Sequence, residues 1–396
     1  FAVDSGAAIT INAAPASRFK FKQWLVASGQ ASIANTALVS TTVQLSQGNA
    51  TVRGDFGCVT FVKKIEQPIV SGNVHVAQWD DDSYFIAGKQ WSNGSMPTLA
   101  EIDKMDLNGN IIWAKTYGDN SVENEFTSIR KTTDGFILAC GSESTFKLWK
   151  VVPNGTEIFW RRYNINGVPA FAQQTSDGGF IISGENSEML IPHIIKSDLS
   201  GNIIWADSSN FCESGYHIYD GQQTSDGGFV YVGADMPLNL FVVKKNSDGS
   251  VAWCQNIAGE FEGRTIRETS DGGFITVSIN STKCVLIKLN ASGNVVWKSE
   301  NSSVERIVAV RQTSDGGFVY AGSTRLIGAG GYDFCLIKTN SAGTVAWTHT
   351  YGASGADETA TSMEITNDGG FIIVGGCGTD EPILYVVKTD ENGLVD

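Results

Sequence analysis

Long apolar stretches, positive charge and proline are all scarce in this 396-residue sequence. No apolar run approaches the roughly 18–20 residues that a membrane-spanning helix requires, so no membrane span is expected. Lysine and arginine together number 28 against 42 aspartates and glutamates. The resulting formal net charge of −14 argues against a nucleic-acid partner, whose phosphate backbone is itself negative. Only 8 prolines accompany 44 glycines, which favours many tight turns.

The cysteines and histidines lack metal-binding spacing. The sequence contains no CxxC, HxH or HExxH motif, so neither a metal site nor a cofactor is expected. The 7 cysteines are irregularly spaced and mostly stand in apolar runs, which favours buried free thiols over a disulfide framework. The three aspartates at 80–82 carry enough charge to attract calcium. Because they occupy a repeated turn position, we interpret them as a solvated turn.

A heptapeptide recurs along the chain. QTSDGGF stands at 174–180, 223–229 and 312–318, and ETSDGGF stands at 268–274. Between these copies, alternating β-branched and aromatic residues are separated by Gly, Asn and Asp turns, which indicates four short antiparallel strands per unit. Segments such as GNIIW and GTVAW close successive units with a tryptophan: Trp113, Trp160, Trp205, Trp253, Trp297 and Trp347.

Repeated four-stranded units of about 40–50 residues are typical of a β-propeller. The seventh unit ends before its tryptophan strand, and residues 58–66 fit that strand with Phe61 in place of the tryptophan. We therefore predict an all-β fold in which residues 58–396 form a seven-bladed β-propeller of four-stranded antiparallel blades. Strand 58–66 would pair with the last blade and so hide two sheet edges. The repeated turn aspartate marks the units: Asp82, Asp134, Asp177, Asp226, Asp271, Asp315 and Asp368.

Residues 1–57 do not fit the repeat and are expected to form a separate small β domain. They contain an apolar strand with a proline, an aromatic-rich strand, a TTV strand and a final ATV…F strand. In this order they resemble the internalin B-repeat-like modules of bacterial surface proteins. The match is partial, because such modules begin with another strand; either the chain is truncated or a neighbouring chain supplies the strand by β-augmentation. The matching residues are Pro15, Phe19, Phe21, Trp24, Thr42, Val43 and Phe56.

The repeat region resembles the propellers of secreted bacterial proteins built from SDGGF…LIK…DGN…W units. That resemblance carries no established activity. Together the two resemblances imply a secreted or cell-surface bacterial protein.

A polar residue stands four positions before each turn aspartate. If the first strand of each blade is innermost, these side chains would line the central channel. The three arginines among them would then hold an anion, since guanidinium groups bind carboxylates bidentately. The alternative is a water-filled channel with salt-bridged walls. The seven positions are Gln78, Arg130, Gln173, Gln222, Arg267, Arg311 and Glu364.

The loops between the second and third strands are longest in blades six, seven and one. These blades are neighbours in a closed ring, so the loops would gather on one face, where propellers commonly bind partners. Aromatic and charged residues in these loops suit an interface. The predicted binding patch consists of Trp91, Arg325, Tyr332, Asp333, Asp380 and Glu381.

The sequence favours a non-catalytic binding or structural module. Its partner would be a surface protein, a glycan or a neighbouring copy of the chain. One alternative is a hydrolase or lyase that acts on an anionic polysaccharide at the channel mouth. Another is a calcium-stabilised adhesin. The motifs leave the question of catalysis open.

Overall fold

The computed structural model describes residues 8–14, 19–65, 70–90, 99–118, 124–135, 137–142, 145–186, 191–208, 215–235, 238–279, 283–378 and 383–395. Over these ranges the chain forms β-strands and no helix. A helix suited to crossing a membrane is accordingly not found among the residues just given. The predicted all-β class is confirmed.

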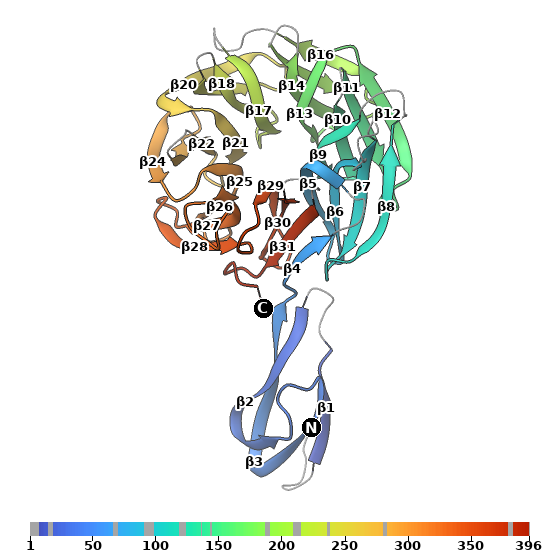
Figure 1. Ribbon diagram of the computed structural model, residues 1–396, viewed down its shortest axis with the longest axis vertical. Helices are drawn as coiled ribbons and strands as arrows, with labels where there is room; N and C mark the ends of the chain where they lie inside the picture. The colour runs from blue at the N-terminus through green and yellow to red at the C-terminus, as the bar shows by residue number, and fades with distance from the viewer. Residues whose placement is uncertain are drawn as a thin grey trace.

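Seven four-stranded antiparallel sheets occupy the described part of residues 61–395 and stand around a central axis as the blades of a propeller (Figure 1). The first strand of each blade lies nearest the axis (Figure 1). Within a blade, each strand pairs with the next one along the chain. The strands are β5 (Val70–Asp80), β6 (Ser83–Gln90), β7 (Ala100–Asp106) and β8 (Ile111–Tyr117) in blade one; β9 (Glu125–Lys131), β10 (Ile137–Ser142), β11 (Phe146–Val151) and β12 (Glu157–Tyr163) in blade two; β13 (Gly167–Gln174), β14 (Phe180–Asn186), β15 (Pro192–Ser197) and β16 (Ile203–Asp207) in blade three; β17 (Gly215–Gln223), β18 (Phe229–Asp235), β19 (Asn239–Lys245) and β20 (Val251–Phe261) in blade four; β21 (Gly263–Glu268), β22 (Phe274–Ile279), β23 (Cys284–Leu289) and β24 (Val295–Asn301) in blade five; β25 (Arg306–Gln312), β26 (Phe318–Thr324), β27 (Asp333–Thr339) and β28 (Val345–Tyr351) in blade six; and β29 (Glu358–Ile365), β30 (Phe371–Cys377) and β31 (Ile383–Thr389) in blade seven.

The fourth strand of blade seven comes from the other end of the propeller sequence. Strand β4 (Phe61–Ile65) pairs antiparallel with β31, and Phe61 lies opposite Lys388. In blades one, three, four, five and six the tryptophan of the fourth strand lies opposite the equivalent lysine, as Trp297 does opposite Lys288. Blade seven therefore joins the two ends of the ring in one sheet.

The N-terminal residues form a separate three-stranded sheet that projects from the ring beside blade seven (Figure 1). Its strand order is β1 (Ala8–Asn12), β3 (Ser40–Cys58) and β2 (Phe19–Ile33). Trp24 is buried and its indole nitrogen donates to the Leu38 carbonyl at 3.0 Å. Strand β3 leads directly toward β4, so the small sheet and the ring are joined by a short connection.

The repeated aspartate fastens the first turn of a blade to its third strand. In blade four, Asp226 accepts hydrogen bonds from the Thr224 hydroxyl at 2.5 Å and the Gly228 amide at 2.9 Å. The buried Lys244 ammonium lies 2.9 Å from the same carboxylate. Partial burial alone would raise the pKa of Asp226, but the Thr224 and Lys244 bonds outweigh it and lower the pKa to about 2. The equivalent ion pairs are Asp134–Lys150, Asp177–Lys196, Asp271–Lys288, Asp315–Lys338 and Asp368–Lys388.

The repeated phenylalanine and tryptophan join neighbouring blades. Trp297 on β24 packs edge-to-face on Phe318 of blade six, with the ring centroids 5.8 Å apart. Trp205 and Trp253 pack in the same way on Phe229 and Phe274, and Trp347 packs on Phe371 in a tilted arrangement.

Blade two departs from the predicted tryptophan alignment. Phe159, and not Trp160, lies opposite the lysine of the third strand and packs on Phe180 of blade three. Trp160 is shifted by one residue to the other side of the strand, where it is 47% exposed and stacks on Trp149. The prediction that Trp160 holds the repeated position is therefore wrong, because side chains alternate between the two faces of a strand.

The described cysteines differ in whether they form a disulfide bond. Cys284, Cys335 and Cys377 are buried free thiols, whereas Cys254 is disulfide-bonded. The expectation of free thiols is thus wrong for Cys254. Disulfide formation depends on which segments fold side by side, and sequence spacing does not reveal this.

Each blade-joining tryptophan also covers a turn glycine of the next blade. Gly343 has φ +81°, a left-handed conformation, and a Cβ added there would lie 2.6 Å from the Trp297 ring. Gly316 has nearly the same φ, +78°, but nothing lies within 4 Å of its Cβ position. The two glycines thus share the backbone requirement and differ in the packing.

We expect Gly343→Ala to lower the free energy of unfolding by about 3 kcal/mol and Gly316→Ala by about 1 kcal/mol. Both variants place an alanine in a left-handed backbone conformation, which lowers stability. Only Gly343→Ala also displaces the Trp297 ring. Urea unfolding of the two variants measures the difference. Equal losses would contradict a tight contact between blades at the tryptophan.

Candidate functional site

A β-bulge in the innermost strand directs one residue of each of six blades toward the central axis. In β17, Ile218 pairs with Gly233 and Asp220 pairs with Val232, so Tyr219 between them is left out of the ladder. The register of β9, β13, β21, β25 and β29 shifts at the same place. Such bulges re-aim side chains next to functional sites. The bulge residue stands seven positions before the turn aspartate, and His75 of blade one, which pairs with Ala87, occupies the same repeat position without a bulge. The seven residues at this bulge position are His75, Thr127, Ala170, Tyr219, Arg264, Val308 and Thr361.

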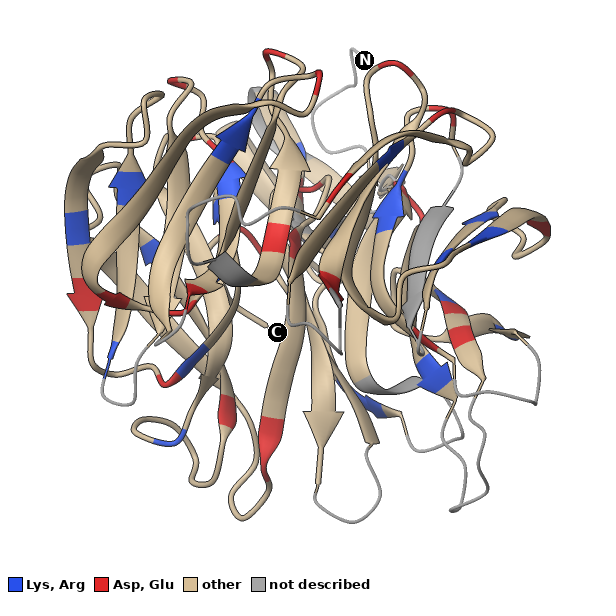
Figure 2. Cartoon of the chain, turned by 90° about the horizontal axis from the view of Figure 1, so that it is seen from above, with Lys and Arg blue, Asp and Glu red and all other residues tan. Residues whose placement is uncertain are grey.

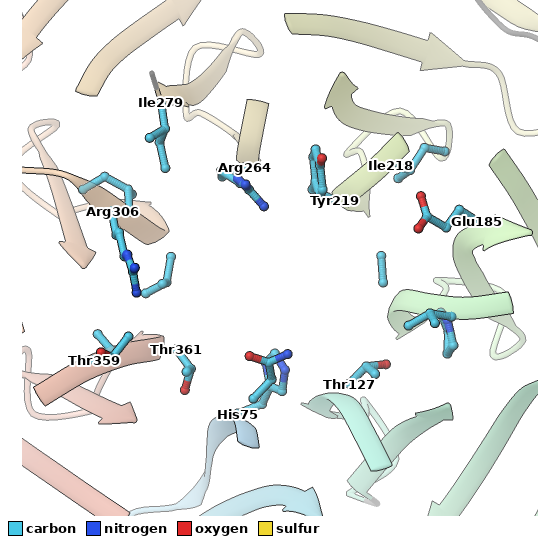
Figure 3. A pocket seen from close by; sticks show the side chains of 17 residues that line it. His75, Thr127, Glu185, Ile218, Tyr219, Arg264, Ile279, Arg306, Thr359 and Thr361 are labelled. Atoms are coloured by element: carbon cyan, nitrogen blue, oxygen red, sulfur yellow. The ribbon is translucent and has the colours of Figure 1, made fainter. Parts of the chain in front are cut away.

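All seven of these residues line a cavity on the axis of the ring. Its wide outer part, the mouth, has a volume of about 560 Å³. Side chains from several blades surround this space, with Arg264 and Arg306 reaching into it (Figure 3). Much of the wall is apolar, including Ile218, Ile279 and Ile307.

The cavity narrows to an inner part of about 100 Å³, the throat, which shares the seven bulge-position residues with the mouth. The throat is lined by four of the predicted channel residues, namely Arg130, Arg267, Arg311 and Glu364. A fifth charged residue, Asp220, lies with them.

The charged groups of the throat form two hydrogen-bonded clusters that interact electrostatically as one network. Arg311 binds Glu364 bidentately, through Nε at 3.2 Å and Nη2 at 2.6 Å. Asp220 accepts from Arg130 at 3.2 Å and from Arg267, and its Oδ2 also accepts from the Thr265 hydroxyl at 2.9 Å. Asp220 of blade four is therefore bound by arginines of blades two and five, and Glu364 of blade seven by one arginine of blade six.

Burial and charge shift the ionisation of this network. Burial alone would raise the pKa of Asp220, but Arg267, Arg130 and Arg311 outweigh it and hold the pKa below its usual value. Burial and the nearby Arg311 charge lower the pKa of Arg267 to about 9, so it remains charged at neutral pH. Burial likewise lowers the pKa of His75 to about 4, which leaves its imidazole neutral.

The three predicted channel glutamines lie outside the cavity wall. Gln78 accepts from the Asn367 amide of blade seven at 2.7 Å. Gln173 accepts from the Gln223 amide of blade four at 3.0 Å, and Gln222 pairs with Val230 in its own blade. The prediction that Gln78 and Gln173 line the channel needs correction, because their side chains bind neighbouring blades; Gln173 also accepts from the throat residue Arg130 at 3.5 Å.

Asp220 was missed by the sequence analysis, although a signal exists. It stands six residues before the turn aspartate, where the other blades carry no charge. A lone charged residue at an otherwise uncharged repeat position therefore marks this member of the network. The uncharged residues at this position in the other six blades are Val76, Ser128, Phe171, Thr265, Ala309 and Ser362.

Part of the predicted loop patch borders the mouth. The Tyr332 ring contacts the guanidinium groups of Arg306, at 4.5 Å, and of Arg325, at 5.2 Å. Because Arg306 also lines the mouth, the loop of blade six and the cavity form one continuous surface. Arg325 pairs with Glu305 at 3.0 Å.

Asp333 does not belong to the exposed part of this surface. It is fully buried, and its Oδ2 accepts from the Ala329 amide at 2.7 Å. Its role is to hold the loop, so its prediction as a binding residue is corrected. Trp91, Asp380 and Glu381 lie outside the described residues.

A second aromatic group borders the mouth in blade four. The Tyr219 ring stacks on His217 at 6.0 Å and lies under the Arg264 guanidinium at 4.5 Å. Arg264 forms an ion pair with Glu262, and His217 contacts Glu185.

Nowhere in the described ranges do three or more His, Cys, Asp or Glu side chains gather as a metal would need.

Comparison with known proteins identifies the fold. No protein-family model and no curated protein matches the chain. The structure of the Dos1 propeller matches with a TM-score of 0.55 and 9% identity, over 82% of this chain and 95% of that chain. YCF48 bound to a D1 peptide matches with a TM-score of 0.55 and 14% identity, over 83% and 96% of the two chains.

YCF48 from Cyanidioschyzon merolae matches with a TM-score of 0.50 and 12% identity, over 84% of this chain and 99% of that chain. Identities this low establish the fold alone. The protein is a β-propeller, as its repeats predict.

We expect Asp220→Asn to lower the free energy of unfolding by about 3 kcal/mol, because it leaves Arg130 and Arg267 without their shared counter-charge. Glu300→Gln, which breaks an exposed pair with Lys283, serves as the control and should cost less than about 1 kcal/mol. Urea unfolding measures both. If the two variants lose equal stability, the throat network does not hold the inner strands together.

Proposed function

We propose that the protein is a non-catalytic binding module that takes a protein partner at the mouth of its central channel. The bulge-position residues carry this proposal. At the turn and blade-joining positions the copies repeat nearly the same residues, yet at the bulge position they range from His75 to Ala170 to Arg264. A position that differs between blades and faces a cavity suits recognition of an asymmetric partner.

The mouth has the composition of a peptide-binding surface. It combines apolar walls, two tyrosine side chains nearby and arginines, which are the residue types enriched where binding energy concentrates. The fold is compatible with this role, since YCF48, a protein of the same fold, has been determined with a D1 peptide bound. That likeness supports the proposal by fold alone.

We place the protein at the bacterial cell surface or outside the cell. The support is the resemblance of residues 1–57 to internalin B-repeat-like modules and of the repeats to secreted propellers. A surface glycan or a neighbouring copy of the chain remains the other partner class for this surface.

The test is affinity selection from a synthetic dodecapeptide library, half with free C-termini and half amidated. We expect a Tyr219→Ala, Arg264→Ala double variant to retain at least tenfold less peptide than the wild type. The matched control is Trp160→Ala, Arg161→Ala, which also removes one aromatic and one arginine side chain, but on outer strand β12.

The control variant should retain peptide as the wild type does. Equal retention by the channel variant, or loss in the control, would overturn the proposed site. A glycan array screened with the same three proteins separates the partner classes. Glycan binding that needs Tyr219 and Arg264, without peptide binding, would keep the site and replace the partner.

A further inference from the structure

The throat carries more positive than negative charge. Arg130, Arg267 and Arg311 face two carboxylates, Asp220 and Glu364, around the inner space of about 100 Å³. The remaining ionisable residues of its wall are His75, Tyr219 and Arg264. The ring therefore encloses one uncompensated positive charge on its axis, in a chain whose formal net charge is −14 and whose acidic and basic residues are distributed over strands and loops alike (Figure 2).

Burying an uncompensated charge costs free energy unless a counter-charge joins it. Within the described residues, the network supplies no third carboxylate to the three arginines. The throat thus has the electrostatics of a site completed by an anion.

A second uncompensated cation lies at the rim of the mouth. Arg264 and Arg325 have Glu262 and Glu305 as partners, whereas Arg306 forms no ion pair with a described residue and stacks on Tyr332. The Arg306 side chain extends beside the open centre of the mouth (Figure 3). The mouth and the throat share lining residues, so both positive charges face one continuous cavity.

We infer that the channel binds the carboxylate terminus of an extended peptide, with the terminal carboxylate in the throat beside Arg130, Arg267 and Arg311. The last side chains of the peptide would lie against the apolar wall of the mouth. Arg306 would contact the peptide nearer the rim. This inference rests on the proposed function and narrows its partner.

The shape of the site favours a peptide over an anionic polysaccharide. The throat, at about 100 Å³, is much narrower than the mouth at about 560 Å³, which suits a single carboxylate group better than a bulky sugar ring. The two tyrosine rings near the mouth already contact His217 and Arg264, or Arg306 and Arg325, and are not open platforms for a sugar. The walls at Ile218, Ile279 and Ile307 match apolar side chains.

The probe is the hexapeptide acetyl-Gly-Ser-Gly-Ser-Ile-Val with a free C-terminus, compared with the same peptide as its C-terminal amide. Saturation-transfer NMR and isothermal titration calorimetry measure binding to the full chain at constant ionic strength. We expect the free carboxylate to bind about tenfold more tightly than the amide, because a charge-assisted hydrogen bond is lost with it.

Two variants with opposite charge changes test the throat. Arg267→Gln should abolish the preference for the free carboxylate. Glu364→Gln removes a negative charge from the throat and should increase the preference severalfold, even though it lowers stability. A merely structural network would weaken binding in both variants. Arg306→Gln should weaken both peptides while the preference persists.

Each remaining outcome decides against the inference. Equal binding of the two peptides, or binding of neither, contradicts a carboxylate site in the throat. Binding of an oligogalacturonate in place of the peptides would assign the throat to an acidic glycan. If library peptides bind at the mouth but amidated and free forms bind alike, the proposed function stands and this inference fails.

Discussion

The antiparallel pairing of β4 with β31 is the interaction on which the ring depends. Without it, β31 would present an open edge in blade seven, and an unpaired edge is a template for aggregation. The pairing also carries Phe61 to the place that tryptophans hold elsewhere. A Cβ at Gly109 of blade one would lie 2.7 Å from the Phe61 ring, so this aromatic packs against the next blade as the tryptophans do. One short strand therefore closes both the sheet and the contact between blades seven and one.

The residues that repeat in the sequence stabilise this closed ring. The aspartate–lysine pair fixes the turn of a blade to its third strand, and the tryptophan or phenylalanine of the fourth strand packs on the next blade. Because these contacts recur in most blades, they hold the inner strands at fixed places around the axis. The bulge position is then free to differ from blade to blade. The rigid repeat and the variable cavity wall are two consequences of one arrangement.

The fold could be predicted from the sequence because its signals are local. Turn glycines, strand alternation and spacing repeat within each unit. The prediction that Trp160 occupies the repeated position was wrong because a shift of one residue reverses the face of a strand. The disulfide at Cys254 could not be predicted, since it depends on which segments the fold brings side by side.

The cavity wall could be predicted only in part. Arg130, Arg267, Arg311 and Glu364 line the throat, but the bulges that aim Tyr219 and Arg264 inward leave no clear sequence signal. The direction of Gln78 and Gln173 was also hidden, because a glutamine reaches a neighbouring blade as easily as a channel. Asp220 is the one missed residue that a comparison of the repeats would have found.

Hydrogen exchange of a chain with Val62→Pro and Lys63→Pro tests the closure directly. Neighbouring residues of a strand point their amides in opposite directions, so one of these prolines must remove a donor to β31. The matched control places two prolines at Val295 and Val296, in the outermost strand of blade five. For the β4 variant we expect faster exchange in β31 and β5, and then around the whole ring. For the control we expect faster exchange only in blade five. Unchanged protection of β31 and β5 in the β4 variant would contradict closure of the ring by β4.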